Sequence, residues 1–168
     1  IIERDDLAIV SVATPLGGDA VLKRALKAGH GLAMPSATSS TTSKNGMRAI
    51  NTAPDQMLLV FAHATPDAEY HVRTGLKGMG YTTDQTDSLV AIEISGPDTM
   101  AAMERLCLLD LHPDNFGIDM TGRTVMEHMS ATIICLADAH FLLLAASSSG
   151  TSFLHAIETS YRNVTGAD

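Results

Sequence analysis

The fold is decided by the stretch Val90-Ala91-Ile92-Glu93-Ile94-Ser95-Gly96-Pro97-Asp98, which holds the clearest strand pattern in the chain and the start of a helix. Val90, Ile92 and Ile94 alternate with less apolar residues, and this period of two predicts a half-buried β-strand. Gly96-Pro97-Asp98 predicts the beginning of a helix, because proline is favoured in a first helical turn. The sequence therefore contains at least one strand-helix unit.

The residues that follow extend this unit. Met100, Met103, Leu106 and Cys107 lie along one face of the predicted helix. Pro113 ends it, since proline disfavours helical geometry at the preceding residue. The remaining pattern predicts strands over 123–126, 131–137 and 141–146 and a last helix over 151–164.

The first half of the chain contains a similar order of elements. It predicts a strand over 7–12, a helix over 19–28, strands over 47–52 and 56–62 joined by Ala53-Pro54-Asp55, and a helix from Thr65 to Met79. The polar segments 30–46 and 82–87 are predicted to be connections, the first of them a mobile loop.

The two halves resemble each other in spacing as well as in order. Asp19 is followed 16 residues later by Pro35, and Asp98 is followed 15 residues later by Pro113. We therefore predict an α+β fold of two similar β-α-β-β-α units, about 1–80 and 88–168, within a single duplicated domain. A chance alignment of short apolar elements is the alternative, because two copies do not establish a period.

Composition narrows the class of protein. A chain of 168 residues with 45% hydrophobic residues can bury a core without disulfides. The net charge of -8 and the lack of a basic cluster argue against a nucleic acid partner. The apolar runs are shorter than the roughly 20 residues of a membrane span, and the first residues do not resemble a signal peptide, so we expect a cytoplasmic protein. The apolar content favours a surface reserved for another subunit.

Motifs that carry chemistry are missing from the sequence. There is no phosphate-binding glycine motif, no HExxH, no CxxC and no GxSxG. Glu127 and His128 are predicted to lie on a strand and so to point to opposite faces, which prevents joint chelation of a metal. Cys107 and Cys135 are expected to be buried thiols. We therefore expect no catalytic, cofactor-binding or metal-binding residues on this chain.

Several segments together carry a family resemblance. They are Ile94 to Asp98, the run Cys107-Leu108-Leu109-Asp110-Leu111-His112-Pro113 with Phe116 and Arg123-Thr124, Ser152-Phe153 with Ile157, and in the first half 7–12, 31–35 and 54–59. With these segments the chain resembles the gamma subunits of heterotetrameric sarcosine oxidase along nearly its whole length. Met57 stands where the family usually has Trp, and Ala53 where Gly commonly precedes Pro-Asp. The small subunit of a related N-methyl amino acid dehydrogenase therefore stays open as an alternative.

The resemblance implies a fold related to the folate-binding domains of the glycine cleavage T-protein. It implies alpha, beta and delta subunits as partners, with flavins on the beta subunit and with NAD and tetrahydrofolate on the alpha subunit. The complex would demethylate sarcosine to glycine, release peroxide and transfer the one-carbon unit to tetrahydrofolate. On this chain it implies a non-catalytic structural role without a cofactor, and we expect Leu109, Asp110, Leu111, His112 and Pro113 to meet a partner.

Two other functions are compatible with the sequence. One is a free-standing folate-binding protein similar to aminomethyltransferases, which saturable binding of tetrahydrofolate would reveal. The other is a small acidic adaptor outside one-carbon metabolism, since fold alone does not fix function. If genes for sarcosine oxidase subunits lie beside the gene of this chain, they would argue against the adaptor function.

Overall fold

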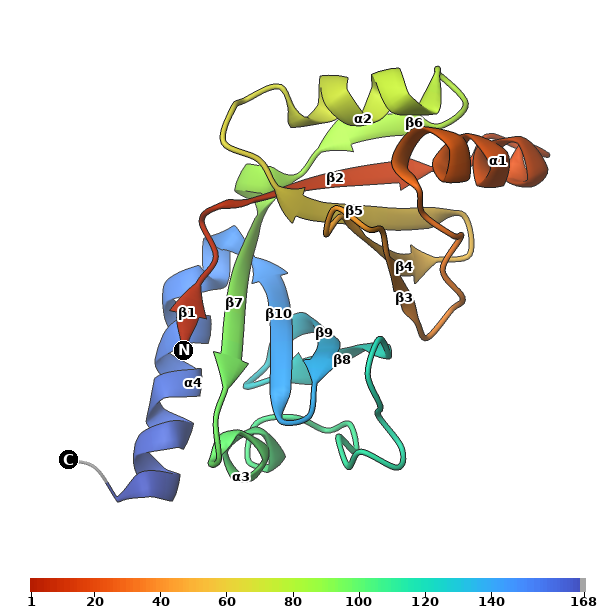
Figure 1. The fold of residues 1–168 in the computed structure, drawn as a ribbon. Helices are drawn as coiled ribbons and strands as arrows, with labels where there is room; N and C mark the ends of the chain where they lie inside the picture. The colour runs from red at the N-terminus through yellow and green to blue at the C-terminus, as the bar shows by residue number, and fades with distance from the viewer. Residues whose placement is uncertain (167–168) are drawn as a thin grey trace. The chain divides into compact units, whose positions relative to one another are not determined.

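The computed structural model describes residues 1–166, which form two compact units (Figure 1). The N-terminal unit is Asp6–Asp87, and the C-terminal unit combines Ile1–Asp5 with the chain from Ser88 onward. Each unit contains one five-stranded antiparallel sheet and two α-helices. The predicted α+β class is therefore confirmed.

The N-terminal unit has its strands in the order β3-β4-β5-β2-β6. Its elements are β2 (Leu7–Ala13), α1 (Asp19–His30), β3 (Ser40–Thr42), β4 (Arg48–Ala53), β5 (Gln56–Ala62), α2 (Ala68–Leu76) and β6 (Tyr81–Asp84).

The C-terminal unit has its strands in the order β1-β7-β10-β9-β8. Its α and β elements are β1 (Ile2–Glu3), β7 (Leu89–Ser95), α3 (Thr99–Glu104), β8 (Thr121–Met126), β9 (Met129–Ala137), β10 (His140–Ala146) and α4 (Gly150–Thr165). Short 3-10 helices at Thr86–Ser88 and Ser147–Ser149 precede β7 and α4.

The two sheets have the same topology. In the N-terminal unit β2 pairs with β5, and β4 and β3 follow towards one edge; in the C-terminal unit β7 pairs with β10, and β9 and β8 follow in the same way. The other edge is filled by β6 in the N-terminal unit and by β1 in the C-terminal unit, each antiparallel to the first strand. The prediction of two similar units is confirmed, with two strands more in each half than the three of the β-α-β-β-α pattern.

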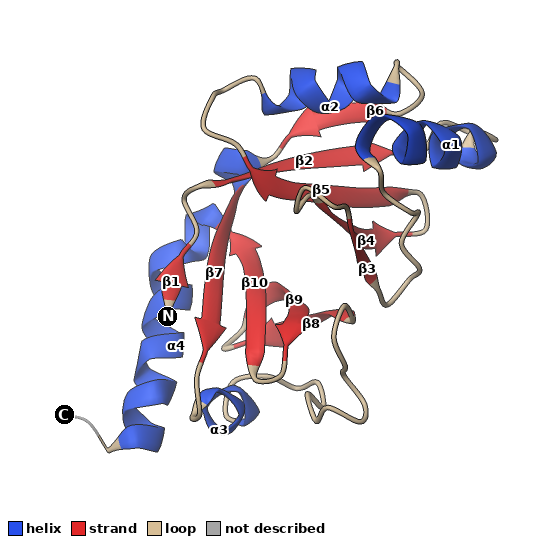
Figure 2. Ribbon diagram, in the orientation of Figure 1, coloured by secondary structure: helices blue, strands red, loops and turns tan. Residues whose placement is uncertain are grey.

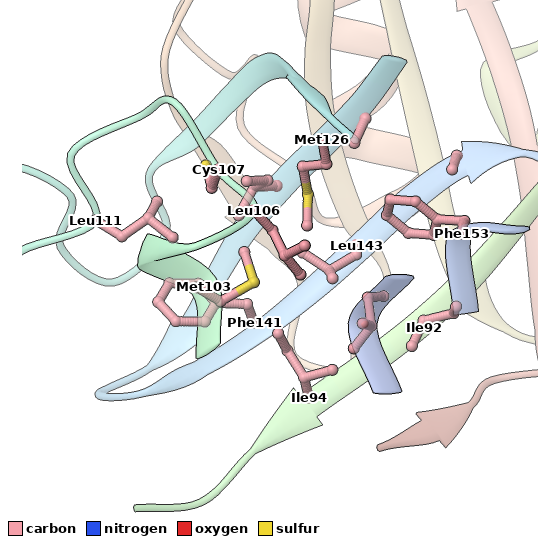
Figure 3. Close-up of a cluster of buried hydrophobic side chains, with 14 of the residues drawn as sticks. Ile92, Ile94, Met103, Leu106, Cys107, Leu111, Met126, Phe141, Leu143 and Phe153 are labelled. Atoms are coloured by element: carbon pink, nitrogen blue, oxygen red, sulfur yellow. The ribbon is translucent and has the colours of Figure 1, made fainter. Parts of the chain in front are cut away.

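The core of the C-terminal unit lies between its sheet and its helices (Figure 3). Ile92 and Ile94 of β7 and Phe141 and Leu143 of β10 share this core with Phe153 of α4. Burying each such side chain contributes about 1.5–3 kcal/mol. The intervening β10 residues are buried as well, so β10 has a continuous apolar run instead of an alternating one.

In the N-terminal unit, helices α1 and α2 cover one face of the sheet and pack against each other (Figure 2). Their closest approach is at Gly29 and Gly75, where a Cβ on Gly29 would lie 2.1 Å from the Gly75 carbonyl oxygen. The neighbouring His30 ring is buried, and its Nε2 donates to the Val72 carbonyl at 3.1 Å. Two glycines thus allow this helix pair to pack closely.

Three predictions about local structure are wrong. The predicted loops 30–46 and 82–87 contain most of two edge strands, β3 and β6, and the N-terminal residues form β1. These strands are specified by backbone pairing with a neighbour, which needs no apolar pattern. Helix α2 ends at Leu76 because Lys77 and Gly78 adopt left-handed φ of 53° and 73°. Met79, predicted to be buried, is consequently 43% exposed.

The first predicted helix of the C-terminal unit also ends early. It stops at Glu104 instead of continuing to Cys107, which forms an isolated bridge with Met126. Glu127 and His128, predicted on a strand, form the turn between β8 and β9. Both cysteines are buried thiols, as expected. Within residues 1–166, no helix has the length and apolar character that a membrane span requires.

Candidate partner interface

The residues that the sequence singled out lie in one long loop, residues 105–120, between α3 and β8. We call this segment the α3–β8 loop. Asp110, His112 and Pro113 are exposed, Leu109 is half-buried, and Leu111 is buried at 5% exposure. The five residues are consecutive in this loop, but only Asp110, His112 and Pro113 lie at the surface.

The two leucines fix the loop to the unit. Leu111 belongs to the hydrophobic core together with Cys107 and Phe116, and Figure 3 shows its side chain near Cys107. Leu109 packs over β8 so closely that a Cβ on Gly122 would lie 2.6 Å from its Cδ1 atom. Their role is therefore to anchor the loop, which leaves partner contacts to other residues.

Asp110 and His112 hold the loop in its turn. The His112 backbone N–H donates to Asp110 Oδ1 at 3.0 Å, and Asn115 Nδ2 donates to Asp110 Oδ2 at 2.6 Å. The first of these bonds, helped by the second, lowers the pKa of the Asp110 carboxyl. The His112 carbonyl accepts from the N–H groups of Asn115 and Phe116, both at 2.8 Å. The loop thus has a defined shape and an ionised aspartate at its surface.

Two exposed apolar side chains flank this turn. Leu108 is 83% exposed and Ile118 is 64% exposed. Neither was among the predicted interface residues. Leu108 lies within the apolar run Leu106-Cys107-Leu108-Leu109, and nothing in that run indicates which leucine points outward. Large apolar side chains at such exposure are typical of protein–protein contact surfaces.

A cavity of about 260 Å³ opens beside the loop, and we call it the loop pocket. Its wall is formed by the loop, the β9–β10 hairpin and α3, and most of its lining is apolar. The residues are Met100, Leu111, Pro113, Phe116, Gly117, Ile118, Cys135, Ala137, Asp138, Ala139 and Phe141. The hairpin residues in the lining are distant in sequence from the loop. The sequence therefore did not indicate that the two segments line one pocket.

The segments that form the loop pocket contain four aspartates. Asp110 and Asp114 are exposed next to the lining residues Leu111 and Pro113, and exposed Asp138 belongs to the lining itself. Asp119 follows the lining residue Ile118. No Lys or Arg occurs from Leu106 to Gly122. Of these four carboxylates, that of Asp138 belongs to the pocket lining.

Two further hollows have more polar linings. The N-terminal unit has one of about 340 Å³ in the corresponding place, beside α1, Pro35 and the β4–β5 hairpin, with Asp19 and Lys23 in its wall. Another, of about 400 Å³, lies between α4 and the β8–β9 turn. In the described part of the chain, no three His, Cys, Asp or Glu side chains are grouped as metal ligands. Burial raises the pKa of the Cys107 thiol, which makes it a poor nucleophile.

No protein-family model matches the sequence, and no curated protein matches it. Among solved structures, the chain is similar to a chain of heterotetrameric sarcosine oxidase from Corynebacterium sp. U-96, with a TM-score of 0.85 and 18% identity over 99% of this chain and 85% of that one. It is also similar to the regulatory subunit of aspartate kinase from Thermus thermophilus, with a TM-score of 0.50 and 14% identity over 95% of this chain and 96% of that one. At these identities the similarity is one of fold. The fold expected from the sequence resemblance is therefore confirmed.

Proposed function

We propose that this chain is a non-catalytic structural subunit of a sarcosine oxidase-type complex. The observation that carries the proposal is the fold shared with a chain of heterotetrameric sarcosine oxidase over 99% of the sequence, at a TM-score of 0.85. In this proposal the partners are alpha, beta and delta subunits in the cytoplasm. The complex demethylates sarcosine or a related N-methyl amino acid.

The sequence motifs of the chain support a non-catalytic role for this subunit. It lacks sequence motifs for binding nucleotides and for nucleophilic catalysis. In our proposal, flavins, NAD and tetrahydrofolate bind to the other subunits, which carry out oxidation, peroxide release and one-carbon transfer. The α3–β8 loop, with Leu108, Pro113 and Ile118 exposed, is the surface that meets a partner.

Co-expression with the alpha, beta and delta subunits of a sarcosine oxidase tests the proposal. We expect the tagged chain to purify with all of them in constant proportion through gel filtration. Leu108→Ser should reduce co-purification without lowering the melting temperature, because Leu108 is 83% exposed. An exposed residue of the N-terminal unit, Tyr81→Ser at 70% exposure, is the matched control and should change neither quantity.

Calorimetry separates this proposal from the folate-binding alternative. We expect no saturable heat when the isolated chain is titrated with tetrahydrofolate. Saturable binding would favour a folate-binding protein, and a chain that stays monomeric beside co-expressed partners would refute the subunit role.

A further inference from the structure

We infer that a hollow in the N-terminal unit binds a free α-amino acid with an apolar side chain. This hollow, of about 340 Å³, lies between α1 and the β4–β5 hairpin, and we call it the α1 hollow. All residues of its lining belong to the N-terminal unit. The inference goes beyond the proposed function and does not depend on it, because no partner subunit takes part.

The α1 hollow has the size and the mixed lining of a small-molecule site. Its volume of about 340 Å³ lies within the range of about 300–1,000 Å³ that is usual for such sites. Met34, Pro35 and Met57 give the lining its apolar part. Met57 belongs to the hydrophobic core of the unit, and Met34 packs against that core. An apolar group of a ligand would therefore contact side chains that the core holds in place.

Hydrogen bonds hold the backbone around the α1 hollow. The Thr14 N–H, directly after β2, donates to the Asp55 carbonyl in the β4–β5 hairpin at 2.8 Å. Strand β5 also pairs with both β2 and β4. The wall is thus formed in the absence of a ligand, so binding does not require the ordering of this backbone.

The polar side chains of the lining are not used inside the protein. Within residues 1–166, the side chains of Asp19, Lys23, Asn51 and Gln56 form no hydrogen bond or ion pair. Asp19 and Lys23 are four residues apart on α1, a spacing at which opposite charges commonly pair. Because they do not pair here, each of the two charges is open to a charged group of a ligand.

The charges at the α1 hollow are of both signs. Asp19 and Lys23 are the charged residues of its lining. Beside the lining, Arg24 on α1 and Asp55 in the hairpin add one charge of each sign. A simple anion would be attracted by one lining charge and repelled by the other, and so would a simple cation. A ligand that carries both charges can pair with both.

An α-amino acid matches this arrangement group by group. Its ammonium donates to the Asp19 carboxylate, and its carboxylate accepts from the Lys23 ammonium. Such charge-assisted hydrogen bonds are stronger than neutral ones. The amides of Asn51 and Gln56 offer further donors and acceptors, and the apolar side chain of the ligand contacts the methionines and prolines of the lining.

The other two hollows are less suited to this ligand. The loop pocket has Asp138 as the only charged residue of its lining, so it offers no cation for a carboxylate. The hollow between α4 and the β8–β9 turn contains Arg105 and Glu127, but a larger share of its lining is polar. It therefore offers less contact to an apolar side chain, and the test has to tell it apart from the α1 hollow.

The test is a titration of the full chain with leucine, followed by calorimetry and by amide chemical shifts. We expect saturable binding, with shift changes in α1 and in the β4–β5 hairpin. N-acetyl-leucine lacks the ammonium and leucine amide lacks the carboxylate, so each should bind at least about tenfold more weakly than leucine. Glycine, which has no side chain to bury, should also bind more weakly.

Substitutions on α1 test the named residues. Lys23→Gln and Asp19→Asn each remove one charge and should weaken leucine binding at least about tenfold. Ala20→Trp places a large side chain in the lining and should abolish binding. Lys27→Gln and Ala28→Trp change exposed residues of the same helix outside the lining, so they should leave binding unchanged. Circular dichroism of each variant shows whether it is folded.

Three results would overturn the inference. The first is no heat and no shift change with leucine at up to about 10 mM, ten times a Kd of about 1 mM. The second is equal binding of leucine, N-acetyl-leucine and leucine amide, or equal losses in the control variants. The third is a set of shift changes confined to α4 and the β8–β9 turn. None of these results bears on assembly with partner subunits, so the proposed function would stand.

Discussion

At the scale of single residues, the turn between β8 and β9 shows where this chain departs from favourable backbone geometry. Glu127 and His128 have φ of 45° and 69°, a left-handed pair that normally selects Asn-Gly. We predict that Glu127→Asn with His128→Gly raises the free energy of unfolding by about 1–2 kcal/mol, because it relieves left-handed strain. Urea unfolding measures the change, and a lower midpoint would contradict the account of strain.

His30 gives the chain a pH dependence with a definite sign. Burial, helped by the charge of His71 and opposed by the Val72 hydrogen bond, lowers the pKa of this imidazole. The unfolded chain, with an ordinary pKa of about 6.5, therefore binds more protons than the folded chain in acid. We predict that stability falls as pH drops below about 6.5.

The measurement is the urea midpoint at a series of pH values between neutral and mildly acidic. His30→Gln, whose amide keeps a donor for the Val72 carbonyl, should reduce the slope of stability against pH. A slope identical to wild type would show that groups other than His30 cause the dependence.

The sequence predicted the burial and secondary structure of some residues correctly and of others incorrectly. Phe153 and Ile157, predicted to face inward, are fully buried. Glu127 and His128 were expected to lie on a strand, but the pairing of Met126 with Met129 places them in a turn. The five predicted interface residues lie in one loop, but the exposure of Leu108 and Ile118 in that loop depends on which side chains the core accepts.

At the scale of elements, the contact between α1 and α2 depends on two glycines. A Cβ on Gly29 would lie 2.1 Å from the Gly75 carbonyl oxygen, and backbone cannot move aside as a flexible side chain could. We predict that Gly29→Ala lowers the free energy of unfolding by about 1–3 kcal/mol, as overpacking does.

Gly150→Ala in α4 is the matched control. Its Cβ would meet Val90 at 3.6 Å, an ordinary contact, so the stability should be unchanged or slightly higher. The melting temperatures of the Gly29→Ala and Gly150→Ala variants test this prediction. Equal effects of the two substitutions would contradict the close-packed helix contact.

Elements with an apolar stripe or run were predictable, and those without one were not. The pattern of β7 and the run of β10 correspond to the observed strands. The edge strands β1, β3 and β6 bury few side chains, and their positions are set by hydrogen bonds to β7, β4 and β2. Such pairing is long-range, so no local pattern in the sequence contains it.

At the scale of the whole molecule, the path of the chain links the two units. β1 precedes the entire N-terminal unit, yet it pairs with β7 of the C-terminal unit, where the Arg4 N–H also donates to the Ala91 carbonyl at 2.9 Å. Unfolding of the N-terminal unit would leave a long flexible loop between β1 and β7, which raises the entropy cost of their pairing.

We therefore predict cooperative unfolding of residues 1–166 as one duplicated domain. Hydrogen exchange under increasing urea should give the same opening free energy for core amides of β2 and of β10. Two clearly different values would show that the units unfold independently.

The central claim is that this chain is a structural subunit of a larger complex. The most direct measurement is the mass, by light scattering after gel filtration, of the chain co-expressed with the proposed alpha, beta and delta partners. The account predicts one peak that contains all four chains in equal proportion, well above the 17.7 kDa of this chain alone. A separate peak of the free chain, beside a complete complex of the other three subunits, would contradict it.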